Sequence, residues 1–223
     1  MTSPPASRLQ TFDLAGPAGR LEALLQEREG RDHTLAAVVC HPHPLYGGTL
    51  HNKVVHRAAG TMHALGAAVL RFNFRGAGGS EGTHDRGTGE LEDARAALDF
   101  MRERYPDARR WLGGFSFGSW VAARLAAAEP DVERLILIAP PVRTQDFSVM
   151  RAWPKPKHVF HGTADEVARL ADLEAEFPAW AEPRTLSRIE GASHFFDKKL
   201  GDLAKVMEEV LGPPAGHRAS RTT

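Results

Sequence analysis

The sequence contains a single cysteine, Cys40, among 223 residues. One cysteine cannot form an internal disulfide, so nothing here indicates an oxidising compartment. Long apolar runs are lacking as well: the longest, from Leu135 to Val142, contains two prolines and is far shorter than the roughly 18 residues that span a bilayer. The segment from Met1 to Arg8 has no apolar stretch of the kind found in secretory signals. These absences predict a cytoplasmic protein that does not enter a membrane.

An excess of charge of either sign is also absent. Lysine and arginine total 28, aspartate and glutamate total 28, and the formal net charge is zero. Nucleic-acid binders usually carry a basic excess, so no nucleic-acid partner is expected. The contents of 42% hydrophobic and 25% charged residues are ordinary for a globular chain, which excludes disorder, collagen and coiled coil as descriptions of the whole protein.

Short apolar runs alternate with amphipathic helical patterns along the chain. Strands are predicted at 8–14, 20–27, 35–41, 67–74, 109–113, 133–138, 157–161 and 184–189, and helices at 52–65, 90–105, 118–128, 170–180 and 200–210. Such alternation predicts an α/β fold, a mostly parallel sheet with helices on both faces and an antiparallel start. No dividing linker is evident, so we predict a single domain over 1–211 and a disordered tail over 212–223.

The sharpest motif is Gly114-Phe115-Ser116-Phe117-Gly118, which fits the pattern G-x-S-x-G between a predicted strand and a predicted helix. A serine in such a tight turn projects its hydroxyl above the sheet, and flanking glycines let the two backbones pass closely. The alternative is an ordinary glycine-rich turn with an incidental serine. The position between strand and helix favours Ser116 as a nucleophile.

A serine nucleophile needs a base, and the base needs an orienting acid. Asp165 and His194 follow Ser116 in the order expected for this kind of fold, each just past a predicted strand. Both therefore fall at carboxyl ends of strands, where ligands bind in open α/β sheets. Glu166 competes with Asp165 for the role of the acid, and Asp146 is a weaker competitor.

Acyl transfer also requires two donors for the oxyanion of the tetrahedral intermediate. The N–H of Phe117, the residue after the nucleophile, is one expected donor. The second should come from the loop His41-Pro42-His43-Pro44-Leu45-Tyr46, where the two prolines have no N–H. His43, Leu45 and Tyr46 remain, and we favour Leu45.

At these residues the sequence resembles the small, capless bacterial α/β-hydrolases, relatives of dienelactone hydrolases and serine esterases. The matching blocks, within about Leu9 to Leu211, are His41-Pro42-His43-Pro44-Leu45-Tyr46-Gly47-Gly48-Thr49, Asn52-Lys53-Val54-Val55, Arg71-Phe72-Asn73-Phe74-Arg75-Gly76, Gly114-Phe115-Ser116-Phe117-Gly118, His161-Gly162 with Asp165, and Ser193-His194-Phe195. The resemblance implies the α/β-hydrolase fold without a cap domain, a triad of Ser116, Asp165 and His194, and ester hydrolysis.

The sequence departs from this family's pattern at two places. Relatives often carry Val-Pro shortly after the acid, whereas Val167 is followed here by Ala168, which is expected to loosen that loop. Dienelactone hydrolases use a cysteine nucleophile, so Ser116 argues against dienelactone substrates.

The sequence does not favour a metal site or a nucleotide-binding loop. Five histidines, at 41, 43, 51, 56 and 63, cluster in sequence, but without a partner cysteine or nearby carboxylate they predict no metal site. His41 and His43 are better explained as residues that hold the oxyanion loop by hydrogen bonds. The glycines from Gly76 to Gly82 suggest a nucleotide loop, but Glu81 stands where the fingerprint requires glycine. Arg75 and Glu81 are therefore interpreted as groups that fix the loop.

The irregular stretch between 140 and 156 lies where lids are inserted in this fold, and it is too short for a lid domain. Its apolar residues Phe147, Met150 and Trp153 have two equal interpretations. They are packing at the edge of the core, or together with Tyr46, Phe117 and Phe195 they wall a shallow substrate pocket.

The expected function is therefore that of a serine hydrolase that cleaves a carboxylic ester of a small substrate through an acyl-enzyme, with no cofactor. Thioester or peptide cleavage by the same triad is an alternative within the class. A catalytically silent hydrolase fold that binds a ligand or partner is the alternative from another class.

Overall fold

The structure, a computed structural model, describes residues 6–30 and 32–212. Within these residues the strands are β1 (Ser7–Gly16), β2 (Gly19–Arg28), β3 (Leu35–Cys40), β4 (Ala68–Phe72), β5 (Arg109–Phe115), β6 (Val132–Ile138), β7 (Lys157–Gly162) and β8 (Arg184–Ile189). The α-helices are α1 (Lys53–Ala64), α2 (Thr88–Arg104), α3 (Phe117–Ala128), α4 (Leu170–Glu176) and α5 (Leu200–Leu211), with short 3-10 helices η1 (Pro44–Tyr46), η2 (Ser148–Arg151) and η3 (Phe177–Ala179). Every predicted element is present. Apart from Gly212, the predicted tail lies outside the described residues.

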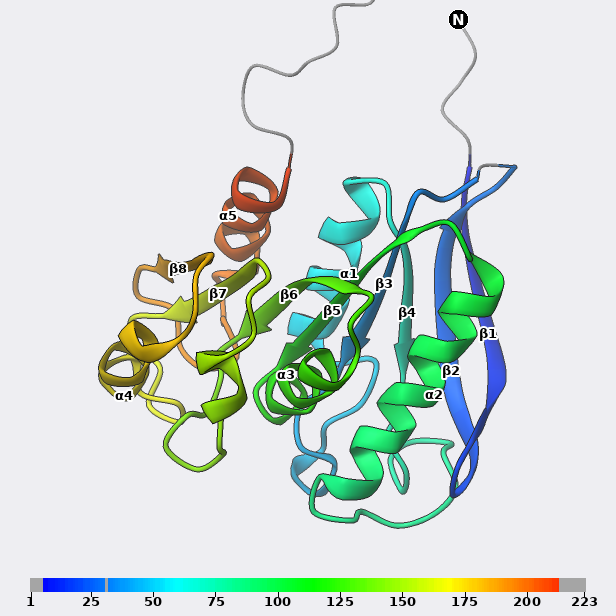
Figure 1. Ribbon diagram of the computed structural model, residues 1–223, viewed down its shortest axis with the longest axis horizontal. Coiled ribbons are helices and arrows are strands. Elements are labelled where there is room, and N and C mark those ends of the chain that lie inside the picture. Colours follow the sequence, from blue (N-terminus) through cyan, green and yellow to red (C-terminus); the bar gives the residue numbers. More distant parts are fainter. Residues whose placement is uncertain (1–5, 31, 213–223) are drawn as a thin grey trace, which may run out of the picture.

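All eight strands form one sheet in the order β1-β2-β4-β3-β5-β6-β7-β8 (Figure 1). β1 pairs antiparallel with β2, and β2 pairs antiparallel with β4, whereas every later pair is parallel. The predicted mostly parallel sheet with an antiparallel start is therefore confirmed. From β3 the chain moves outward to β4 and then returns to β5 on the other side of β3. The point where strand order reverses lies between β3 and β5, which is where open α/β sheets bind ligands.

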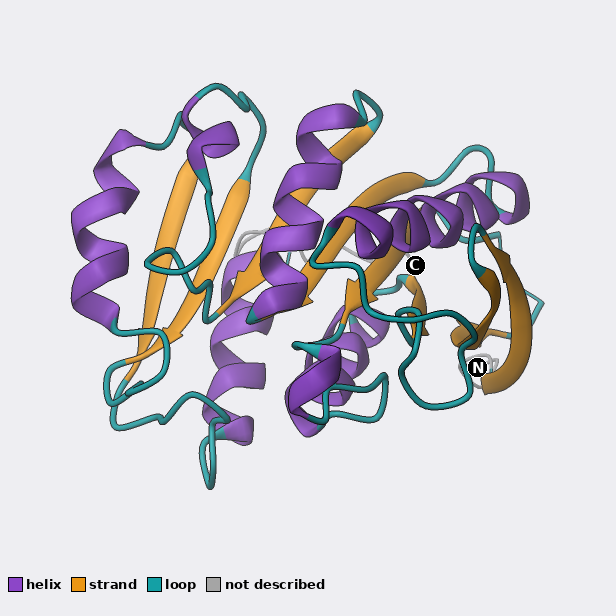
Figure 2. Cartoon of the chain, turned by 90° about the horizontal axis from the view of Figure 1, so that it is seen from below, coloured by secondary structure: helices purple, strands orange, loops and turns teal. Residues whose placement is uncertain are grey.

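Helices cover both faces of this sheet, as Figure 2 shows from below. One apolar core includes Leu98 of α2, Val121 of α3 and Leu173 of α4, together with strand residues such as Val38. The other includes Val55 of α1 and Met207 of α5, and it receives Val39 from the opposite face of β3. Successive strand residues point to opposite faces, so the apolar run of β3 supplies both cores at once.

The ends of the helices follow from local sequence. Asn52 precedes α1 and its side chain accepts hydrogen bonds from the N–H groups of Val54 and Val55. Gly66, with φ of 100°, follows the last turn, where a left-handed residue favours glycine. At the start of α2 the Glu90 carboxylate accepts hydrogen bonds from the N–H groups of Gly87 (2.6 Å) and Asp85 (2.9 Å).

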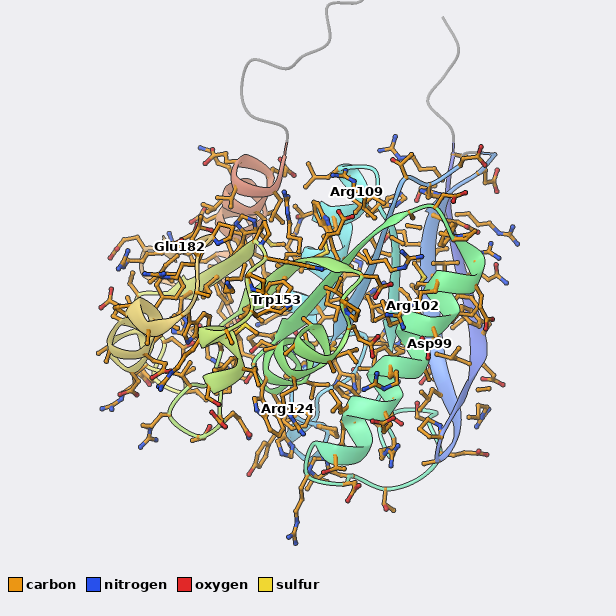
Figure 3. All side chains as sticks on the ribbon, viewed as in Figure 1. Asp99, Arg102, Arg109, Arg124, Trp153 and Glu182 are labelled. Atoms are coloured by element: carbon orange, nitrogen blue, oxygen red, sulfur yellow. The ribbon has the colours of Figure 1, made fainter. Side chains whose placement is uncertain are left out.

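Ion pairs join the outer helices to neighbouring loops. Arg102 of α2, labelled with Asp99 in Figure 3, pairs with Asp99 one turn away and with Glu129 and Asp131 beyond the end of α3. These contacts lie away from the carboxyl ends of the strands. They tie α2 to the chain that leads into β6.

Candidate active site

Ser116 occupies the tight turn between β5 and α3, with φ of 53° and ψ of −121°. The close approach of two backbones explains the flanking glycines. A Cβ on Gly114 would lie 2.2 Å from the carbonyl oxygen of Gly118, and a Cβ on Gly118 would lie 2.4 Å from those of Cys40 and His41. Only glycine fits at these two positions. The turn itself is held by a hydrogen bond from the Ser116 N–H to the carbonyl of Ile138 (2.9 Å).

His194 follows β8 and faces Ser116. Its Nε2 atom lies 3.1 Å from Ser116 Oγ, and its Nδ1 atom lies 2.8 Å from Asp165 Oδ2. The carboxylate accepts a hydrogen bond from Nδ1–H, so in the neutral ring Nε2 is free to accept the serine proton. His194 and Asp165 are both buried, and the Phe115 ring packs against the imidazole with centroids 5.0 Å apart. The three residues identified from the sequence are thus brought together in hydrogen-bonding geometry.

The loop after β7 holds Asp165 through its second carboxylate oxygen. Oδ1 accepts hydrogen bonds from the N–H groups of Val167 (2.9 Å) and Ala168 (2.8 Å). The expectation that Ala168 loosens this loop is wrong. Alanine retains the N–H that a proline would lack, and that N–H is bound to Asp165. The competing acids point elsewhere: Glu166 is exposed, and Asp146 is exposed and accepts hydrogen bonds from Ser148.

Buried His161 of β7 supports the same loop. Its Nε2 atom lies 2.6 Å from the carbonyl oxygen of Ala168 and 3.7 Å from Asp165 Oδ2. Because the carbonyl can only accept, Nε2 carries the proton. Burial lowers the pKa of His161, which keeps the ring neutral. In the sequence His161 stands out only as part of a matching block, since no local pattern shows which loop atom a buried histidine will reach.

The loop after β3 is the candidate source of the second oxyanion donor. The N–H of Leu45 donates to His43 Nδ1 (3.3 Å), and the N–H of Tyr46 donates to the carbonyl of His43 (3.1 Å). The Leu45 N–H, the predicted oxyanion donor, therefore already has an acceptor inside the loop, which favours another N–H for that role. Within the described residues the N–H of His43 makes no hydrogen bond. Phe117, the first residue of α3, also has an N–H without an intrahelical acceptor.

His41 fixes this loop to the sheet. Its Nδ1–H donates to the carbonyl of Pro42 (2.6 Å), and its Nε2 accepts from the N–H of Phe74 (3.0 Å) beyond β4. Burial lowers the pKa of His41 to about 4, so the ring stays neutral and keeps one donor and one acceptor. The predicted loop-holding role of the two histidines is confirmed. Gly48 allows the loop to close, because a Cβ there would lie 2.0 Å from the carbonyl oxygen of Pro42.

The loop between β4 and α2 packs behind the oxyanion residues. The His84 ring lies 4.6 Å from the His43 ring and 5.8 Å from the Phe117 ring, measured between centroids. His84 Nδ1 lies 2.8 Å from the buried carboxylate of Glu90. Desolvation by burial, followed by repulsion from His84, lowers the pKa of His43. His84 and Glu90 were missed from the sequence, because the contact joins a loop to a helix start and follows no motif.

The predicted loop-fixing roles of Arg75 and Glu81 are confirmed. Arg75 forms a two-pronged pair with buried Asp93 of α2 (2.7 Å from Nη2 to Oδ1). Glu81 Oε2 accepts a hydrogen bond from the N–H of Arg20 (2.8 Å).

The expected pocket residues fall into two groups. Three of them are buried in the apolar core that lies between the sheet and helices α2 and α3: Phe147, Met150 and Trp153, the last of which is labelled in Figure 3. Phe147 stacks on Trp180 at 5.7 Å, so the edge-packing interpretation holds for these three and they do not wall the site. Tyr46 and Phe195, by contrast, are exposed on loops that carry the site.

No group of three or more metal-ligating side chains gathers within the described residues. No helix in that part of the chain is long and apolar enough to cross a membrane.

Comparison with known proteins shows the family to which this chain belongs. Residues 35–188 match the family described as "Serine aminopeptidase, S33". An uncharacterised protein of Rickettsia prowazekii is 36% identical over 205 residues, covering 88% of this chain and 86% of its own.

Two solved structures share both sequence and fold with this chain. An alpha-beta serine hydrolase homologue from Coxiella burnetii is 36% identical with a TM-score of 0.87, covering 91% of this chain and 97% of its own. A serine hydrolase without a lid from Xanthomonas campestris is 38% identical with a TM-score of 0.84, covering 91% and 93%. The expected capless architecture is therefore shown.

Proposed function

The chain belongs to the serine aminopeptidase S33 family of α/β-hydrolases, and we propose that it hydrolyses carboxylic esters of small substrates through an acyl-enzyme on Ser116. The observation that carries the proposal is the continuous line from Asp165 Oδ2 to His194 Nδ1 (2.8 Å) and from His194 Nε2 to Ser116 Oγ (3.1 Å). A serine hydroxyl becomes a nucleophile when a base accepts its proton, and this arrangement supplies the base together with its orienting acid.

In the acylation step Ser116 Oγ attacks the ester carbonyl while its proton passes to His194 Nε2. Asp165 holds the ring in the productive tautomer and stabilises the imidazolium that forms. The N–H groups of Phe117 and His43 donate to the oxyanion. Collapse of the intermediate breaks the bond to the alcohol oxygen, which takes the proton from His194. Water, deprotonated by His194, then releases the carboxylic acid and restores Ser116.

The proposal is tested by labelling with a fluorophosphonate, read by intact mass on the wild type, Ser116→Ala and His194→Ala. One adduct is expected on the wild type and none on either variant, with melting temperatures near that of the wild type. Hydrolysis of p-nitrophenyl acetate should fall by about 10³-fold or more in both variants. A well-folded wild type that forms no adduct would overturn the mechanism and favour the silent binding alternative.

Peptide cleavage is a second candidate, favoured by the family's description as an aminopeptidase. It requires the same acyl-enzyme but a poorer leaving group, an amine that must be protonated as it departs. Rates on matched ester, thioester and aminoacyl amide substrates separate the alternatives. We expect the ester to be hydrolysed fastest, and a preference for the amide would assign the chain to the peptidases.

A further inference from the structure

Large exposed apolar side chains concentrate on the loops of the proposed site. Within residues 6–30 and 32–212 five such side chains are exposed: Leu9, Leu45, Tyr46, Val167 and Phe195. Leu9 lies on β1, at the edge of the sheet. The other four lie within three residues of His43, Asp165 or His194 in sequence. Exposed apolar groups that gather at one place mark a contact surface, whereas scattered ones need no explanation.

Phe195 and Val167 flank the histidine and the acid. The Phe195 ring lies 5.2 Å from the His194 ring and 6.0 Å from the ring of Phe115, the residue before the nucleophile. Its other neighbour is the Lys53 ammonium, 6.0 Å from the ring centroid, which pairs with Asp197. Val167 belongs to the loop that binds Asp165, and it donates its N–H to that carboxylate.

The chemistry of ester cleavage determines which part of a substrate meets these side chains. His194 Nε2 must give its proton to the departing alcohol oxygen, so the alcohol lies on the histidine side of the tetrahedral carbon. The carbonyl oxygen points the other way, toward the N–H groups of Phe117 and His43. A chain attached to the alcohol oxygen therefore extends toward the side of the site where the Phe195 ring packs against His194.

We propose that Phe195 and Val167 form a binding surface for the alcohol portion of the substrate, and that the preferred substrates are esters of apolar, alkyl or aryl alcohols. This inference rests on the proposed function. Phe195 is 44% exposed and Val167 is 61% exposed, so they can cover one side of such a chain and leave the other in water. Full burial of a methylene is worth about four-fold in binding, so half coverage predicts about two-fold per methylene.

The experiment compares two series of esters. In the first, acetate is esterified with methanol, ethanol, butanol and hexanol, so that the acetyl-enzyme is common and only the alcohol changes. In the second, methanol esterifies acids from acetate to hexanoate. For the wild type, kcat/KM in the alcohol series should rise about two-fold per methylene. The slope within each series is the readout, so a uniform loss of activity in a variant does not affect it.

Phe195→Ala should flatten the alcohol series and leave the slope of the acyl series unchanged. Phe195→Leu, which keeps apolar area, should retain most of the alcohol slope. Val167→Ser should lower the same slope by a smaller amount, and it changes an exposed position with little risk to folding. Leu9→Ala is the matched control, an exposed apolar residue on the sheet edge, and it should change neither slope.

A flat alcohol series in the wild type, or an alcohol slope that Phe195→Ala leaves unchanged, would overturn the inference. So would a variant that lowers the acyl slope instead, since Phe195 would then face the acid portion. The ester series could be flat while the wild type self-associates in sedimentation and Phe195→Ala does not. That outcome would assign the surface to a second copy of the chain. Fluorophosphonate labelling and methyl acetate hydrolysis report the proposed function separately, and if both fail the inference falls with it.

Discussion

The two sides of the proposed site hold their groups by different means. On the acid side, after β7 and β8, the side chains of Asp165 and His194 bind each other directly. Backbone N–H groups donate to the other carboxylate oxygen of Asp165. On the oxyanion side, after β3 and β4, the groups proposed to act are backbone N–H groups, and buried histidines such as His41 position the chain that carries them. One side relies on charge, and the other relies on neutral rings and on close packing of backbone.

The largest effect is expected on the acid side. Asp165→Asn keeps the size of the side chain but presents no carboxylate to His194 Nδ1–H, which favours the wrong tautomer. We expect kcat/KM for p-nitrophenyl acetate to fall by about 10⁴-fold, with the circular dichroism spectrum unchanged. Glu166→Gln is the control, because that exposed neighbour should be replaceable at no cost. Equal losses in both variants would contradict the assignment of the acid.

A change on the oxyanion side should instead alter how the free energy of unfolding depends on pH. His41 has an ordinary pKa near 6.5 in the unfolded chain and about 4 when folded, because burial opposes its charge. Between these values the unfolded chain binds more protons than the folded chain. The contribution of His41 to the free energy of unfolding is therefore fully present above about pH 6.5 and is lost as the pH drops toward 4. The shift corresponds to about 3 kcal/mol.

His41→Gln, which can still donate and accept but does not titrate, tests this expectation. Urea unfolding of both proteins at pH 4 and pH 7 gives the measurement. The variant should lose about 3 kcal/mol less than the wild type over that interval, whatever its stability at pH 7. Identical losses would mean that His41 does not contribute to acid unfolding.

Close packing on the oxyanion side is tested at Gly48. An alanine there would place its Cβ 2.0 Å from the carbonyl oxygen of Pro42 and 2.7 Å from that of His43, so this backbone must move. A displaced donor should lower kcat by about 10²-fold. Gly60→Ala is the matched control, since nothing lies within 4 Å of a Cβ at that position in α1, and it should be neutral or slightly stabilising.

The smallest effect is expected at Ala168. Ala168→Pro removes the N–H that donates to Asp165 Oδ1, whereas Ala168→Ser keeps it. We expect about a ten-fold loss of kcat/KM in the proline variant, equivalent to one hydrogen bond to a charged group, and little change in the serine variant. If the two substitutions behave alike, the backbone N–H does not contribute to holding the acid.

The difference between the two sides also explains what sequence reasoning could reach. Ser116, Asp165 and His194 are side-chain groups whose order and position at strand ends are visible in the sequence. The choice of Leu45 as donor rested on little, because backbone N–H groups are alike in every residue. Only the folded loop shows that the Leu45 N–H already has an acceptor. Phe147, Met150 and Trp153 stayed ambiguous, since an apolar residue in an irregular stretch packs equally well in a core or at a pocket.

The sequence by itself determined the elements, their order, the turn that carries Ser116 and the residues available to form a triad. These features depend on local periodicity, on glycine at close approaches and on spacing along the chain. Tertiary structure alone decided that His161 reaches Ala168, that His84 and Glu90 pack behind His43, and that Phe195 and Val167 remain exposed beside the histidine and the acid. Each of these features depends on contacts or burial between segments that are distant in sequence. Such segments become neighbours only when the strands have assembled into the sheet.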